Sequence, residues 1–115
     1  MIESANAFLR SVNEKAHLLQ LFNKINFLKI SLVSENENVY FALTNGKIEL
    51  LNSNIEHVSS YEITGDLQAI IDLLEGKEKL RSLILSGRLE TSASFRTTLL
   101  LESLFFLAKA EKIIS

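Results

Sequence analysis

The sequence predicts an α+β domain in which a helix and four strands precede a second helix, a last strand and a closing helix. Three observations support this class. Apolar residues recur at helical spacing near both ends of the chain, apolar and polar residues alternate between them, and an Asn-Gly pair joins two strand-like runs. No proline-rich or low-complexity linker interrupts the chain, so residues 1–115 are expected to form one domain with its own core.

The first helix is expected to run from Ser4, which can cap it, to about Asn23. Its polar side includes His17, which we expect at the surface. The apolar residues define one face: Ala5, Phe8, Leu9, Val12, Ala16 and Leu19. This pattern predicts a helix that packs one side against a sheet.

Four strands are expected after this helix. From Phe27 the run FLKISL alternates with a period of two, which is typical of a half-buried strand, and a polar hairpin follows at residues 35–38. The run VYFALTNGKIELL contains two strands joined at Asn45-Gly46, a pair that tolerates the positive φ angles of a type I′ turn. A fourth strand is expected from about Glu56 to Ile63.

A second helix of about three turns is expected after Gly65, with Asp66 or Thr64 as its cap. Gly76 stands where a helix commonly ends in a left-handed residue. The apolar residues on one side of this helix are Leu67, Ile70, Ile71 and Leu74. They predict a second helix on the sheet.

A turn or brief helix is then expected to lead into a last strand, residues 83–91, in which Gly87 allows a bulge or a close backbone approach. Ser94 is expected to cap the closing helix, which has two apolar sides. One broad side comprises Leu100, Leu101, Leu104, Phe105, Leu107 and Ala108. The second comprises Phe95, Leu99 and Phe106. Because a sheet covers one side, the second is expected to meet another helix, a neighbouring chain or an apolar ligand.

The second half of the chain carries a recognisable succession of features. Asp66-Leu67 opens a short helix, Gly76 ends it, an apolar stretch follows, and Gly87-Arg88-Leu89 leads through a strand to the amphipathic helix from Phe95. This succession, from Thr64 to Ala108, resembles the sterol carrier protein type 2 domain family. VYFALTNGKIEL resembles the family's strand-turn-strand unit. Ala93 and Ser94 stand where the family usually has Gly-Asp, and serine caps a helix about as well as aspartate.

The resemblance implies a five-stranded, mostly antiparallel sheet with helices packed on one face, in the order α-β-β-β-β-α-β-α, enclosing an apolar tunnel. Family members bind sterols, fatty acids, fatty acyl-CoA and other lipids there and transfer them without catalysis. The residues then expected to bind lipid are Tyr40, Ile71, Leu74, Leu85, Phe95, Leu99, Leu104, Phe105 and Phe106. The alternative is a protein-interaction or homodimerisation module with a tunnel filled by side chains.

Arg88 and Arg96 bracket the junction of the last strand and the last helix, where a lipid carboxylate or phosphate could meet the tunnel mouth. A guanidinium group binds such a headgroup in a bidentate manner. The alternative is that both arginines only lie at the surface, as most arginines do.

Catalysis is not expected, because the chain has two histidines, no cysteine and scattered carboxylates. His57 is expected in the core or at its rim, with a lid or headgroup contact as the alternative. The glycines spell no phosphate-binding loop, and no histidine or cysteine has metal-ligand spacing, so we expect no cofactor and no metal.

The composition limits which binding partners and which cellular compartment are expected. Twelve basic and fourteen acidic residues give a net charge of −2 without a basic block, which argues against nucleic-acid binding. No run approaches the roughly 20 apolar residues that stable membrane insertion takes, and the start MIESANAFLR lacks the pattern of an export signal. The absence of cysteine fits a reducing compartment, so the cytoplasm is expected.

Overall fold

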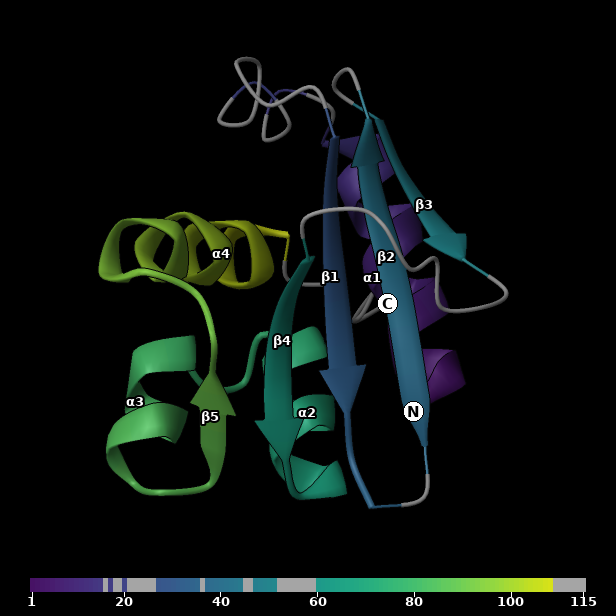
Figure 1. The fold of residues 1–115 in the computed structure, drawn as a ribbon. Helices are drawn as coiled ribbons and strands as arrows, with labels where there is room; N and C mark the ends of the chain where they lie inside the picture. Colours follow the sequence, from purple (N-terminus) through teal and green to yellow (C-terminus); the bar gives the residue numbers. More distant parts are fainter. Residues whose placement is uncertain are drawn as a thin grey trace.

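The computed structural model describes residues 1–15, 17, 20, 27–35, 37–44, 47–51 and 60–108. The elements follow in chain order: α1 (Ile2–Glu14), β1 (Phe27–Val33), β2 (Asn38–Thr44), β3 (Lys47–Leu51), β4 (Ser60–Gly65), α2 (Leu67–Leu74), α3 (Leu80–Leu85), β5 (Leu89–Thr91) and α4 (Phe95–Leu107) (Figure 1). The predicted α+β class is confirmed.

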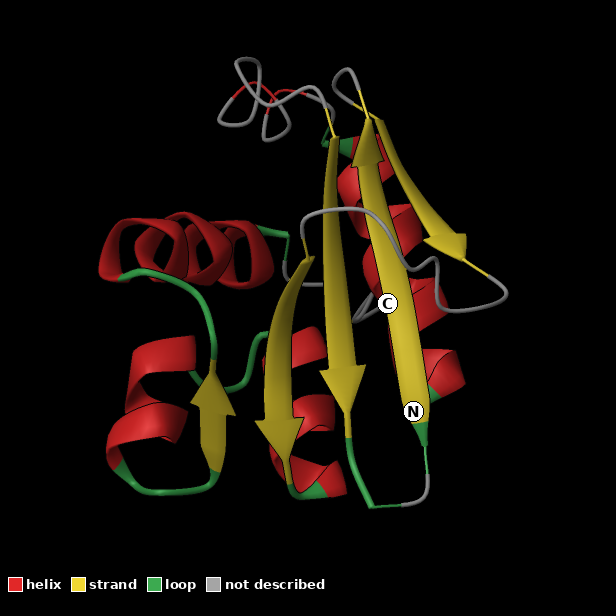
Figure 2. Ribbon diagram, viewed as in Figure 1, coloured by secondary structure: helices red, strands yellow, loops and turns green. Residues whose placement is uncertain are grey.

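The five strands form one sheet in the order β3-β2-β1-β4-β5. Neighbouring strands are antiparallel except β1 and β4, which run parallel, so the predicted mostly antiparallel sheet is confirmed. Figure 2 shows α1 and α2 behind the sheet, with α3 and α4 at its β5 edge. The front face carries no helix among the described residues.

The core lies between the sheet and the helices. Alternate residues of the central strands, such as Ile30 of β1 and Phe41 of β2, point toward the helices and are fully buried. The ring of Phe8 from α1 packs edge-on against Phe41, with centroids 5.4 Å apart, and against Phe105 of α4 at 4.9 Å. These three rings join sheet, first helix and last helix in one apolar cluster.

The first helix departs from prediction at both ends. It begins at Ile2 with Met1 as its cap, so Ser4 is an internal residue, and its Oγ donates to Glu75 Oε2 at 3.3 Å. The helix ends at Glu14, earlier than expected. The predicted apolar face is buried at Ala5, Phe8 and Val12; Leu9 is half-buried, Ala16 and Leu19 lie outside the described residues, and His17 is exposed as expected.

The expected strand over residues 83–91 is wrong in its first half. Residues 83–85 belong to α3, and only Leu89–Thr91 form a strand. Gly87, at φ 79°, is the left-handed residue after α3, because its N–H donates to Ile84 O and the next N–H to Leu83 O. Nothing lies within 4 Å of a Cβ placed at Gly87, so the expected bulge or close approach is replaced by a helix end. The brief helix that was expected as an alternative to a turn before the last strand is therefore present as α3, and it extends to Leu85.

Three other local predictions are confirmed. Asp66 caps α2 by accepting from the Ala69 N–H at 2.7 Å, and Ser94 caps α4 by accepting from the Thr97 N–H at 3.3 Å. Gly76, at φ 72°, ends α2 in the left-handed conformation. The pairing of β2 with β3 extends to Thr44↔Lys47; the Asn45-Gly46 turn and His57 lie outside the described residues.

Candidate functional site

The closing helix α4 presents two different faces. Leu101, Leu104 and Phe105 point into the core and are fully buried. On the other side, Phe95 is 69% exposed, Phe106 is 37% exposed, and Leu99 is half-buried. Leu107, expected on the broad apolar side, is 51% exposed. The second apolar side therefore lies mainly at the surface of the described domain.

The structure brings only part of the predicted lipid-binding set together. Three of the nine residues belong to the core: Leu74, Leu104 and Phe105. Two are half-buried: Ile71 and Leu99. Three are exposed: Leu85, Phe95 and Phe106. Leu85 is the most exposed, at 88%, because it is the last residue of α3 and not part of a strand.

Tyr40 lies on the opposite face of the sheet from the helices. It pairs with Ser31, and its neighbour Phe41 points into the core, so the alternation of β2 turns Tyr40 away from the core. The Lys29 Nζ lies 5.6 Å from the centre of its ring. Tyr40 is thus separated by the sheet from the predicted residues that lie in the core, Leu74, Leu104 and Phe105.

Arg88, at the entry to β5, is surrounded by three carboxylates. Its guanidinium lies 3.4 Å from Asp66 Oδ2, 3.5 Å from Asp72 Oδ2 and 3.7 Å from Glu78 Oε2. The hydrogen bond to Asp66 raises the pKa of Arg88 above its ordinary value. A lipid headgroup would have to compete with these three groups, so Arg88 chiefly holds β5 against α2.

Asp66 also carries a pH-dependent part of the stability. The Ala69 N–H, followed by Arg88, lowers the pKa of this carboxyl below its ordinary value of 3.8. Its contribution is therefore fully present above pH 3.8 and is lost as the pH falls through the lower folded-state pKa. Asp66→Asn keeps a capping oxygen but no charge.

We therefore expect the wild type to be more stable than Asp66→Asn above pH 3.8, and the two urea midpoints to converge below it. Urea titrations at a series of pH values measure this. A difference between the two urea midpoints that stays constant down to strongly acid pH would contradict the stabilising role of the Asp66 charge.

Arg96 differs from Arg88. It is exposed on the first turn of α4, and no carboxylate among the described residues pairs with it. Of the two predicted headgroup contacts, Arg88 pairs with carboxylates among the described residues and Arg96 does not.

Glu102 is the acidic residue of α4, and it is buried against α3. It accepts from the Arg81 backbone N–H at 3.0 Å and from the Arg81 guanidinium at 3.1 and 3.0 Å. These contacts fix α3 on α4. In the sequence, Glu102 stands out as a single carboxylate in an otherwise largely apolar helix. The sequence did not identify Arg81 as its partner, because that contact depends on how α3 packs against α4.

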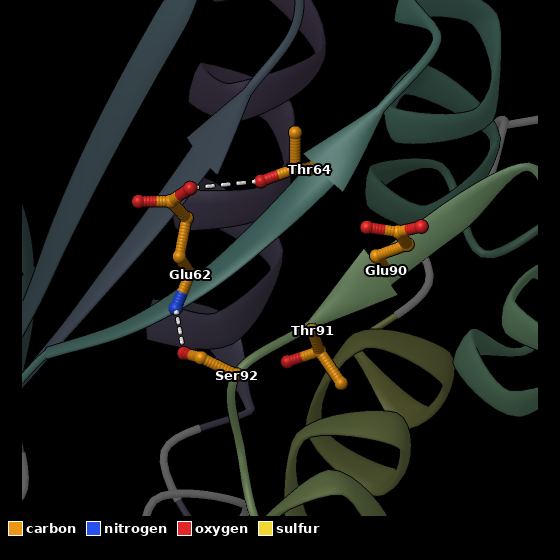
Figure 3. Close-up of a pocket in the computed structure, with 5 residues that line it drawn as sticks. All are labelled: Glu62, Thr64, Glu90, Thr91 and Ser92. Carbon is orange, nitrogen blue, oxygen red and sulfur yellow. Dashed lines mark hydrogen bonds between the residues drawn. The ribbon is translucent and has the colours of Figure 1, made fainter.

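Two of the surface pockets are lined by described residues alone. The larger, about 390 Å³, lies over β4 and β5 (Figure 3), and its lining is polar: Glu62, Thr64, Glu90, Thr91 and Ser92. Within it the Glu62 N–H donates to Ser92 Oγ and Thr64 Oγ1 donates to Glu62 Oε1, both at 2.9 Å. The smaller, about 170 Å³, is lined by Ser34, Glu35, Asp66 and Leu67. None of the nine predicted lipid-binding residues lines either pocket.

Two other kinds of site are absent from the described ranges. These ranges contain no group of three or more histidine, cysteine, aspartate or glutamate residues that could hold a metal ion. Within the same ranges, no helix has the length and apolar character to cross a membrane.

Residues 5–106 match the model of the SCP-2 sterol transfer family. A crystal structure of sterol carrier protein 2 is similar, with a TM-score of 0.61, 17% identity and coverage of 96% of each chain. Sterol carrier protein-2 like-3 from Aedes aegypti has a TM-score of 0.60 and 17% identity over 88% of this chain and 95% of its own. The apo form of sterol carrier protein 2 from Yarrowia lipolytica has a TM-score of 0.59 and 15% identity over 92% and 89%. At these identities the likeness shows the fold. No curated protein sequence matches the chain.

Proposed function

The chain belongs to the SCP-2 sterol transfer family, whose model matches residues 5–106, and we propose that it is a non-enzymatic carrier that binds and transfers lipids or fatty acyl chains. The family match carries this proposal. The abundance of apolar residues in α4 supports it, because they exceed what the core covers. We place this single-domain carrier in the cytoplasm, as expected from the lack of cysteine.

The acyl chain is proposed to enter between α2 and α4. These helices contact each other, and each carries a half-buried apolar residue, Ile71 on α2 and Leu99 on α4. Leu74, Leu104 and Phe105 lie deeper and are closely packed, so the ligand must displace them from part of the core. Entry therefore requires α4 to move outward.

The other predicted residues take different positions in this proposal. Tyr40 and Leu85 are not part of the proposed lipid-binding site, since Tyr40 faces away from the helices and Leu85 is exposed at the end of α3. Arg96 is the remaining headgroup contact, because Arg88 already pairs with three carboxylates. Phe95 and Phe106 stand outside the entry point, on the exposed side of α4.

Affinity for saturated fatty acids is expected to rise with chain length. Burial of each additional methylene contributes about 0.8 kcal/mol, which corresponds to about a fourfold tighter dissociation constant. Displacement of a fluorescent fatty acid measures this series. Leu99→Trp should narrow the entry and lower the affinity most for long-chain fatty acids. Leu85→Trp places the same side chain at an exposed position and is the matched control, which should leave the affinity unchanged. An affinity independent of chain length would contradict the proposal.

A second candidate function is a protein-interaction or homodimerisation module without a ligand. The observation that favours it is the close contact of Phe8 with Phe41 and Phe105, which fills the space between sheet and helices with side chains. Native mass spectrometry before and after denaturing extraction distinguishes the two functions. Co-purified lipid on a monomer supports the carrier, and a dimer without extractable lipid supports the module.

A further inference from the structure

Glu102 joins the middle of α4 to the first turn of α3. Its Oε1 accepts from the Arg81 backbone N–H at 3.0 Å, and its Oε2 lies 3.1 Å from Nε and 3.0 Å from Nη2 of the Arg81 guanidinium. The N-cap residue of α3, Lys79, makes no side-chain cap hydrogen bond. Glu102 therefore satisfies one of the free N–H groups at the start of α3 from another helix. We call this group of contacts the Glu102–Arg81 latch.

The helix on the other side of the latch, α3, is fixed to the sheet. Leu83 is fully buried, and its carbonyl oxygen accepts from the Arg88 N–H at 3.0 Å, directly before β5. Glu78, shortly before α3, lies 3.7 Å from the Arg88 guanidinium. Both ends of α3 are thus held at the edge of the sheet. An outward movement of α4 would separate Glu102 from Arg81 instead of carrying α3 along.

The latch lies next to the proposed entry of the acyl chain. Glu102 follows Leu99 by three residues, so the two are neighbours on the surface of α4. Among the described residues, no other hydrogen bond joins α4 to a different helix or strand. We infer that the latch holds α4 against α2 and thereby sets the rates at which a fatty acyl ligand enters and leaves. This inference rests on the proposed carrier function, and it assigns Glu102 and Arg81 as positioning residues.

The different burial of the two partners determines how the latch acts. The Arg81 side chain is 48% exposed, whereas that of Glu102 is only 11% exposed. An ion pair between two exposed side chains contributes little, because water replaces each partner. A nearly buried carboxylate that loses its donors is costly, so the closed position of α4 is favoured. Because Arg81 is half-exposed, it can be replaced without disturbing the core.

Native-state hydrogen exchange tests the latch without a ligand. Arg81→Ala removes the guanidinium and should make the α4 amides exchange about tenfold faster, on the scale of one hydrogen bond to a charged group, while the α1 amides keep the wild-type rate. Glu102→Gln should act in the same direction, and Arg81→Lys should restore part of the protection. Asp66→Asn is the matched control, because it also changes a carboxylate that pairs with an arginine into an amide but does not touch α4. Its α4 amides should exchange at the wild-type rate.

Stopped-flow mixing with a fluorescent fatty acid tests the consequence for the carrier. The latch is closed before entry and after it, so its loss should lower the barrier between the two states. Arg81→Ala should therefore raise the association and dissociation rate constants by the same factor, about tenfold, and leave Kd unchanged. A purely structural contact would alter Kd or the global stability and would not accelerate both steps equally.

The two measurements separate the latch from the carrier function. Unchanged α4 exchange in Arg81→Ala, equally fast α4 exchange in Asp66→Asn, or wild-type rate constants in Arg81→Ala would each overturn the inference. A wild type that binds no fatty acid would overturn the proposed carrier function, and hydrogen exchange then decides alone whether the latch holds α4.

Discussion

Replacement of Phe105 by alanine is expected to lower the free energy of unfolding by about 4 kcal/mol. Phe105 is 1% exposed and contacts Phe8, which in turn packs on Phe41 of β2. Alanine would leave a cavity where α4, α1 and the sheet meet, and neighbouring rings can fill only part of it. Since domains of this size are stable by about 5–15 kcal/mol, the loss is a large share of the total. Urea denaturation measures it.

The adjacent residue provides the matched control. Phe106 occupies the same helix and has the same side chain, but it is 37% exposed. Phe106→Ala is therefore expected to lower the free energy of unfolding by about 1 kcal/mol. Both variants change helix propensity equally, so the difference between their free energies of unfolding measures the effect of burial. Similar losses in both variants would mean that α4 does not turn Phe105 toward the core.

Replacement of Gly65 by alanine is expected to cost about 3 kcal/mol. Gly65 is the last residue of β4 and pairs with Leu89 of β5. A Cβ at this position would overlap the Arg88 carbonyl oxygen and lie 2.5 Å from Leu89 Cδ2 and 3.1 Å from Leu89 Cα. Two of these three atoms belong to the backbone, so the strands themselves must separate.

Gly87→Ala separates this steric effect from backbone preference. Gly87 has a φ of 79°, and a Cβ added there would meet no atom within 4 Å. Gly87→Ala should therefore lower the free energy of unfolding by about 1 kcal/mol, which is the cost of holding alanine at a positive φ angle. Thermal and urea unfolding of both variants should rank Gly65→Ala as the less stable. The reverse order would show that β5 can move away from β4 at little cost.

Several local features of this fold could be predicted from the sequence alone. The caps at Asp66 and Ser94 and the left-handed glycine at Gly76 each depend on groups within a few residues, so a short stretch of sequence is sufficient to predict them. The alternation of β2 and β3 around an Asn-Gly pair similarly predicted which strands pair.

Other features depended on residues distant in sequence. The apolar run at residues 83–85 is compatible with strand or helix, and it became α3 because Leu80 and Leu83 are buried together and Arg81 bonds Glu102 of α4. The close backbone approach, expected at Gly87, is instead at Gly65, because β5 pairs there. Helical or extended periodicity does not specify such partners.

The same distinction applies to the candidate site. The sequence by itself determined that α4 has apolar residues on two sides, since this follows from helical spacing. Only the tertiary structure decided that Phe105 faces the core, that Phe95 and Phe106 face solvent, and that Tyr40 lies across the sheet. The physical reason is that burial depends on which elements pack against a helix or strand, and those contacts join residues far apart in the chain.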